Sequence, residues 1–230
     1  MRYHNLTIVG TSHIAKESLD EVRHAVAKHP DLIALELDKE RLFALLGKVK
    51  REKLKLKHIK KIGFKGFLFS LLGEYAENKL GEQVGVKPGD EMKLAAQLAA
   101  QLQIPVVLID QQITTTMRRF SEVLTWKEKW NFLVDVIKAI FTRKPMPFDL
   151  SKVPSKRVVQ KLTKEVKQRY PNVYKVLVEE RNEVMAKRLA KLIRDDPVRS
   201  ILAIVGAGHE EELIELIKKE LKHYSKSHKQ

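Results

Sequence analysis

The chain has 230 residues, 43% of them hydrophobic, which is enough to bury the core of one domain or of two small ones. It has no cysteine, which excludes disulfide bonds, cysteine catalysis and thiolate metal ligands. No apolar run approaches the ~20 residues that span a bilayer, and the N-terminus lacks a signal-peptide pattern, so we expect a cytoplasmic protein. Charged residues make up 32% of the chain, mostly as mixed Lys and Glu, a bias typical of thermophiles.

The formal net charge of +15 is concentrated in one segment. Residues 48–61, "KVKREKLKLKHIKK", hold eight Lys or Arg and one Glu. A solvated basic segment and a contact with RNA or with an anionic membrane surface are both consistent with this run. It contains no zinc-finger spacing and no ribonucleoprotein motif.

Four short runs rich in Ile, Val and Leu predict strands that are covered by helices on both faces. An amphipathic helix between the first two gives the size of a right-handed βαβ unit, and a second helix is predicted over residues 89–103. The sequence therefore predicts an α/β fold. The four runs are residues 6–10, 32–37, 104–110 and 200–206.

Long helical stretches replace this pattern in the second half of the chain. Trp126 and Trp130 lie at helical spacing within residues 126–141, and we expect them to pack in the core or between helices. The apolar face of the same helix makes a homodimer plausible. A further long amphipathic helix is predicted at residues 172–193. We expect a single domain with an α/β core at residues 1–115 and 197–230 and a helical insertion at residues 116–196.

Polar residues follow or end the predicted strands: His13, Glu36, Asp110 and His209. The first and last strands run into the same Gly-x-x-His pattern, "GTSH" and "GAGH". Because ligands of open parallel sheets bind beyond the carboxyl ends of the strands, we expect both histidines in one site, with Glu36 on a strand between theirs. Two imidazoles and a carboxylate could hold a divalent Mn, Co or Zn ion with open positions for water. Alternatively, each histidine is a capping or hydrogen-bonded residue.

Six blocks, spread in order along nearly the whole chain, carry a family resemblance: "GTSHIAKES", "ALELDKERL", "PGDEMKLAAQLA", "LIDQQITTTMRR", "VEERNEVMAKRL" and "IVGAGHEEEL". They resemble the TraB/PrgY pheromone-shutdown family, which is grouped with GumN-like proteins and TIKI proteases. The resemblance implies a mixed, largely parallel sheet flanked by helices, as in erythromycin-esterase and ChaN-like proteins. It also implies a metalloprotease-like site, with His13, Glu36 and His209 as metal or catalytic residues and Arg41 and Arg181 orienting carboxylates or substrate.

The chain departs from the family pattern at three polar positions. Gln111 and Gln112 follow Asp110 where the family usually has Arg and Asp, and Asn182 follows Arg181 where it has Asp. These changes remove charge-assisted hydrogen bonds, which implies an altered substrate or a site without turnover. Many family members also carry a C-terminal membrane region that is missing from this sequence, so a soluble form is expected.

Three functional hypotheses follow. The first is a metal-dependent hydrolase, a peptidase acting on a peptide or small signalling substrate, with Glu36 or Glu91 as general base and Asp110 in the same site. Glu91 is alternatively an acid of a first helical turn, where the helix dipole favours it. The second is a protein that sequesters a peptide or small ligand without turnover. The third is an accessory protein that binds RNA or an anionic membrane through residues 48–61.

Overall fold

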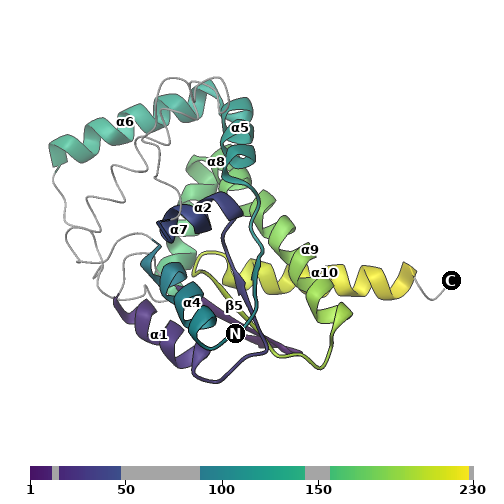
Figure 1. The fold of residues 1–230 in the computed structure, drawn as a ribbon. Coiled ribbons are helices and arrows are strands. Elements are labelled where there is room, and N and C mark those ends of the chain that lie inside the picture. Colours follow the sequence, from purple (N-terminus) through teal and green to yellow (C-terminus); the bar gives the residue numbers. More distant parts are fainter. Residues whose placement is uncertain (12–15, 48–88, 143–155, 228–230) are drawn as a thin grey trace.

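A five-stranded sheet forms the centre of the protein, and the computed structural model describes residues 1–11, 16–47, 89–142 and 156–227 (Figure 1). The strands are β1 (Arg2–Tyr3), β2 (Leu6–Thr11), β3 (Leu32–Leu35), β4 (Val106–Leu108) and β5 (Ile201–Gly206). Their order is β1-β2-β5-β3-β4. The pairs β2–β5, β5–β3 and β3–β4 are parallel and β1–β2 is antiparallel, which confirms the predicted mixed, largely parallel sheet.

The strand order corrects one expectation. β5, the last strand in the sequence, lies between β2 and β3, so the strand that carries Glu36 is not between the two Gly-x-x-His strands. Ile204 of β5 pairs with Val9 on one side and with Leu35 on the other. An apolar run in the sequence indicates that a strand is buried, but it does not specify which strands lie beside it in the sheet.

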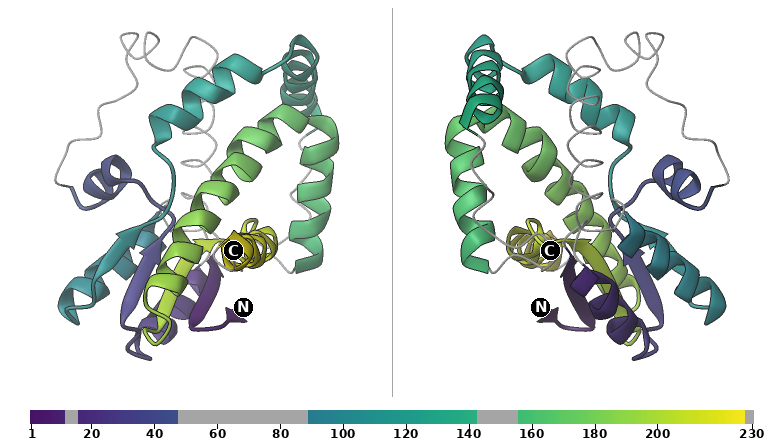
Figure 2. Two further views of the ribbon diagram at one scale, coloured as in Figure 1. Left: turned by 90° about the vertical axis from the view of Figure 1, so that its right-hand side faces the viewer. Right: turned by 90° about the vertical axis from the view of Figure 1, so that its left-hand side faces the viewer.

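Helices cover both faces of the sheet (Figures 1 and 2). No helix within the described ranges is both long and apolar enough to cross a bilayer. The helical elements are α1 (Lys16–Val26), α2 (Lys39–Leu45), α4 (Asp90–Gln101), α5 (Ile113–Val123), α6 (Trp126–Thr142), α7 (Lys156–Arg169), α8 (Pro171–Tyr174), the π-helix η2 (Lys175–Glu179), α9 (Glu180–Asp195) and α10 (Glu210–Ser227).

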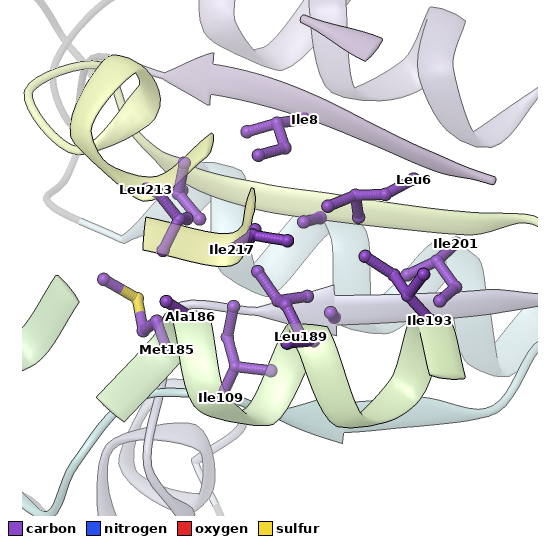
Figure 3. Packing of buried hydrophobic residues seen from close by; sticks show 14 of the residues in the cluster. Leu6, Ile8, Ile109, Met185, Ala186, Leu189, Ile193, Ile201, Leu213 and Ile217 are labelled. Carbon is purple, nitrogen blue, oxygen red and sulfur yellow. The ribbon is translucent and has the colours of Figure 1, made fainter. Parts of the chain in front are cut away.

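The core has two layers because successive strand residues point to opposite faces of the sheet. Leu6, Ile8 and Ile201 face α9 and α10, where Leu189 and Ile217 pack against them (Figure 3). On the other face, α1 and α4 cover the intervening residues of β3 and β5. Small side chains on α4 are fully buried, which lets the helix lie close to its neighbours. That second layer includes Val22, Ile33, Leu35, Ala95, Ala99, Leu202 and Ile204.

Two helical predictions are changed by the structure. The single helix predicted at residues 172–193 is divided into α8, η2 and α9, with the π-helical turn just before Arg181. The core packing predicted for two tryptophans is wrong, because α6 extends beyond the sheet (Figure 1). Trp126 is 83% exposed and Trp130 is 67% exposed, and Lys129 Nζ lies 3.7 Å from the Trp126 ring centroid. Helical spacing places apolar residues on one face, but it does not supply a surface that covers them.

Candidate functional site

Three of the predicted residues meet at the carboxyl edge of the sheet. Glu36 directly follows β3, Asp110 follows β4 by two residues, and His209 follows β5 by three. Because these strands are parallel and neighbouring, their ends share one edge. The three side chains are buried, at 4%, 2% and 8% exposure. Glu36 is fixed by its backbone, whose N–H donates to Ile204 O at 3.1 Å and extends the β3–β5 ladder.

Arg181, in the first turn of α9, links the two buried carboxylates. Its Nη2 donates to Glu36 Oε1 and, at 2.7 Å, to Asp110 Oδ2, while its Nε lies 3.1 Å from Asp110 Oδ1. Burial lowers the pKa of the guanidinium, but the Glu36 and Asp110 carboxylates raise it by more, so the net pKa lies above its ordinary value. Nη1 donates to Leu177 O at 3.0 Å, within the π-helical turn. Arg181 is thus a permanent cation held on several sides.

Arg41, which lies on α2, also pairs with Asp110. Its Nη2 donates to Asp110 Oδ2, and its Nε donates to Asp38 Oδ2 at 2.7 Å. Asp38 also caps α2, accepting from Arg41 N at 3.0 Å. Asp38 was not among the residues predicted from the sequence, although an Asp one residue before a helix is a usual capping signal. We call Glu36, Asp38, Arg41, Asp110 and Arg181 the buried charge cluster.

His209 adjoins this cluster at Glu36. Its Nε2 lies 3.3 Å from Glu36 Oε1, and its Nδ1 lies 2.6 Å from Asn182 Oδ1. The other oxygen of Glu36 accepts from Gly206 N at 2.6 Å. The Gly-x-x-His turn therefore supplies two groups to one carboxylate, a backbone amide from its glycine and the imidazole three residues later.

A second layer of side chains lies behind His209. Asn182 Nδ2 donates to Glu212 Oε2 at 3.0 Å, and Tyr174 OH donates to Glu212 Oε1 at 2.7 Å. Burial and the hydrogen bond to Glu212 raise the pKa of Tyr174 above its ordinary value, so the phenol stays protonated. Sequence reasoning did not find Tyr174 or Glu212, because no local spacing relates three residues on α8, α9 and α10. Asn182 was visible only as a departure from the family pattern.

The remaining predicted residues have different outcomes. His13 and residues 48–61 lie outside the described residues, so the meeting of the two histidines and the basic contact stay predictions. Glu91 is buried in the first turn of α4, and the hydrogen bonds described above do not include it. Gln111 turns toward α5, where its Nε2 donates to Thr116 Oγ1 at 2.8 Å.

No three His, Asp or Glu residues within the described ranges are arranged to hold a metal ion. His209 Nε2 and Glu36 Oε1 are nevertheless adjoining nitrogen and oxygen donors of the kind that Mn, Co and Zn sites use in proteins without cysteine.

A cleft of about 910 Å³ lies along β2 and β5, and its described lining includes Gly208 but neither Glu36 nor His209. Tyr174, Gly208 and Glu212 belong to its lining, so it reaches the second layer behind His209. Lysines 164 and 167 of α7 line it together with Glu21 and Glu210. The cleft thus offers charged groups of both signs beside the site.

The sequence was compared with known protein families and with known proteins. The model of the TraB/PrgY/gumN family matches residues 3–220. An uncharacterised protein of Methanocaldococcus jannaschii is 36% identical over 221 residues, which cover 94% of this chain and 54% of that protein. The chain therefore spans about half the length of this relative. Because the family match covers nearly the whole chain, the protein belongs to the TraB/PrgY/gumN family.

Proposed function

We propose that this protein is a divalent-metal-dependent hydrolase that cleaves a peptide-sized substrate beside Glu36 and His209. The observation that carries the proposal is the pair of potential ligand atoms at the carboxyl edge of the sheet, where His209 Nε2 lies 3.3 Å from Glu36 Oε1. At the Glu36 end of the buried charge cluster, an imidazole and a carboxylate could thus hold one ion.

The donor chemistry at this point fits a divalent ion. An imidazole nitrogen and a carboxylate oxygen are common ligands of Zn, Mn and Co, and the third predicted ligand is His13. Such an ion, when bound, polarises a carbonyl and lowers the pKa of a bound water.

The arginines have positioning roles in this proposal. The Arg181 guanidinium already donates to Glu36, Asp110 and Leu177, which supports a role in holding carboxylates rather than in binding substrate. Arg41 is held in the same way by Asp38 and Asp110. Together they would fix Glu36 and Asp110 at the strand ends before substrate arrives.

The adjoining cleft supports a peptide-sized substrate. Its volume of about 910 Å³ is in the range of small-molecule and short-peptide sites. Lys164 and Lys167 line the cleft from α7, and Glu21 and Glu210 line it from α1 and α10. The cleft could therefore pair with both the carboxylate and the ammonium groups of a peptide.

The second candidate function is sequestration of a peptide or small ligand without turnover. One observation favours it: both oxygens of Glu36 already accept hydrogen bonds, from Arg181 and from Gly206. A carboxylate held in this way is a weaker base, because hydrogen bonds to its charged form stabilise that form.

Metal analysis and peptide cleavage test both candidates. Protein produced with Mn, Co and Zn in the medium is analysed for bound metal and incubated with a mixed peptide library that is read by mass spectrometry. Hydrolysis predicts stoichiometric metal and cleavage, both lost in His209→Ala and retained in His223→Ala, which removes an exposed histidine of α10. A metal-free protein that binds peptides without cleaving them indicates sequestration. If the protein shows neither metal, cleavage nor peptide binding, both candidates are wrong.

A further inference from the structure

We infer that Tyr174, Glu212 and Asn182 form a hydrogen-bonded relay that keeps a proton on Nδ1 of His209, so that in the neutral ring Nε2 carries the lone pair. The inference deepens the proposed function and rests on it for the use of Nε2, but the protonation of Nδ1 follows from the hydrogen bonds alone. We call these three side chains the His209 relay.

The direction of the relay is set by Glu212. An ionised carboxylate has only acceptor atoms, so the group of Asn182 that faces Glu212 Oε2 at 3.0 Å must be its NH₂. Tyr174 OH donates to the other oxygen at 2.7 Å, and Tyr174 is buried at 3% exposure. The carboxylate is therefore held by a donor on each oxygen.

The orientation of Asn182 follows from this contact. With its NH₂ toward Glu212, the amide presents Oδ1 to His209, at 2.6 Å from Nδ1. An amide oxygen only accepts hydrogen bonds, so Nδ1 must carry the proton at this short distance. Asn182 is fully buried, so no bulk water competes for the same contact.

The relay acts against the preference that Glu36 would impose by itself. A neutral imidazole 3.3 Å from Glu36 Oε1 would place its single proton on Nε2 and donate it to that carboxylate. Nε2 would then have no lone pair for a metal ion. By fixing the proton on Nδ1, the relay turns the lone pair of a neutral imidazole toward Glu36, and under the proposed function these two groups would hold a cation between them.

The three relay residues are positioning residues, because they act through His209. They come from α8, α9 and the first turn of α10, whereas Glu36 follows a strand. The packing of these three helices thus fixes the orientation of the His209 imidazole, as outer hydrogen-bond partners of metal-binding histidines commonly do.

Nitrogen NMR of the histidine side chains tests the inference directly. ¹⁵N-labelled protein is examined in alkaline buffer with EDTA, where long-range ¹H–¹⁵N correlations distinguish protonated from unprotonated ring nitrogens. We expect a protonated Nδ1 for His209 in the wild type. Glu212→Met removes both acceptor atoms, so we expect the proton of His209 to move to Nε2. In Tyr174→Phe the acceptor of Glu212 remains, and Nδ1 should stay protonated.

An unprotonated Nδ1 in the folded wild type overturns the inference, whether or not any variant folds. So does a Glu212→Met variant with native-like spectra whose Nδ1 remains fully protonated. The result is separable from the proposed function, because it requires neither metal nor substrate. If the protein does hydrolyse peptides with a bound ion, Glu212→Met should lower the affinity for that ion by about 10- to 100-fold.

Discussion

Replacing Arg181 with methionine should destabilise the protein strongly, because it would leave buried carboxylates without their shared cation. The side chains of Glu36 and Asp110 are 3% and 0% exposed, and that of Arg181 is 15% exposed. Removal of one partner from a buried ion pair typically costs about 3–5 kcal/mol. Arg41 would still pair with Asp110, so we expect the lower end, about 3 kcal/mol, in the free energy of unfolding. For a chain of this length, that loss corresponds to a decrease in Tm of about 6 to 12 °C.

Urea denaturation followed by circular dichroism measures this loss. Lys187→Met is the matched control, because it removes an exposed positive charge from the same helix, and it should change the free energy of unfolding by less than about 0.5 kcal/mol. Similar small losses in both variants would refute the view that the buried charge cluster depends on Arg181.

A double-mutant cycle identifies the cause of the loss. If the cost comes from the unpaired carboxylate, Glu36→Gln should be less costly in the Arg181→Met background than in the wild type, since it removes the charge that Arg181 no longer balances. We expect a coupling energy of about 1–3 kcal/mol between the two positions. Additive effects would instead show that Arg181 stabilises the fold through packing and through its contact with Leu177.

Three further stability changes are expected in urea denaturation. For Glu128, burial raises the pKa, but the hydrogen bonds at the starts of α6 and α8 lower it by more. The stability that these bonds contribute is present above the unfolded pKa of 4.5 and is lost as the pH falls below it. Glu128→Gln should therefore cost about 1–3 kcal/mol at neutral pH and progressively less in acid. Burial and two neighbouring glutamates raise the pKa of Glu21, which costs stability once pH rises above 4.5, so Glu21→Gln should stabilise the protein at neutral pH and not in acid. Gly10→Ala should cost about 1–3 kcal/mol, because its Cβ would lie 3.1 Å from the backbone of Ala207. Gly208→Ala is the control and should be neutral or stabilising, because its Cβ would meet no described atom within 4 Å. Equal effects of the two substitutions would refute the close approach of β2 to the turn after β5.

The sheet was predictable because each buried strand is an uninterrupted apolar run. Residues 200–206 were expected as a strand and form β5 over Ile201–Gly206. The polar residue at the end of each run was enough to place Glu36, Asp110 and His209 at one edge, since parallel strands end together. The position of β5 between β2 and β3 depends on contacts between residues almost 200 positions apart, such as Thr7 and Leu202, and no local pattern encodes it.

The partners of the site residues were less predictable than the residues themselves. Arg181 was expected only from the family resemblance, and its two carboxylate contacts depend on the π-helical turn that shifts the start of α9. Tyr174 and Glu212 reach the site because α10 packs against α9 and α8 leads through η2 into the first turn of α9. Helical periodicity indicates which face of each helix is buried, but not which two helices bring their first turns together.

Two of the three departures from the family pattern, Gln111 and Asn182, have different surroundings in the structure. Gln111 turns toward Thr116 on α5, so the change at this position lies at the rim and bears on what approaches the site. Asn182 lies in the interior, where an Asp would place a negative charge directly against His209 Nδ1. In this protein the negative charge lies one hydrogen bond farther away, on Glu212, which accepts from Asn182 Nδ2. The other end of the same amide, Asn182 Oδ1, faces His209 Nδ1. An Asn at 182 keeps an acceptor beside His209 Nδ1, so under the proposed function we expect a changed ligand affinity and not a lost site geometry.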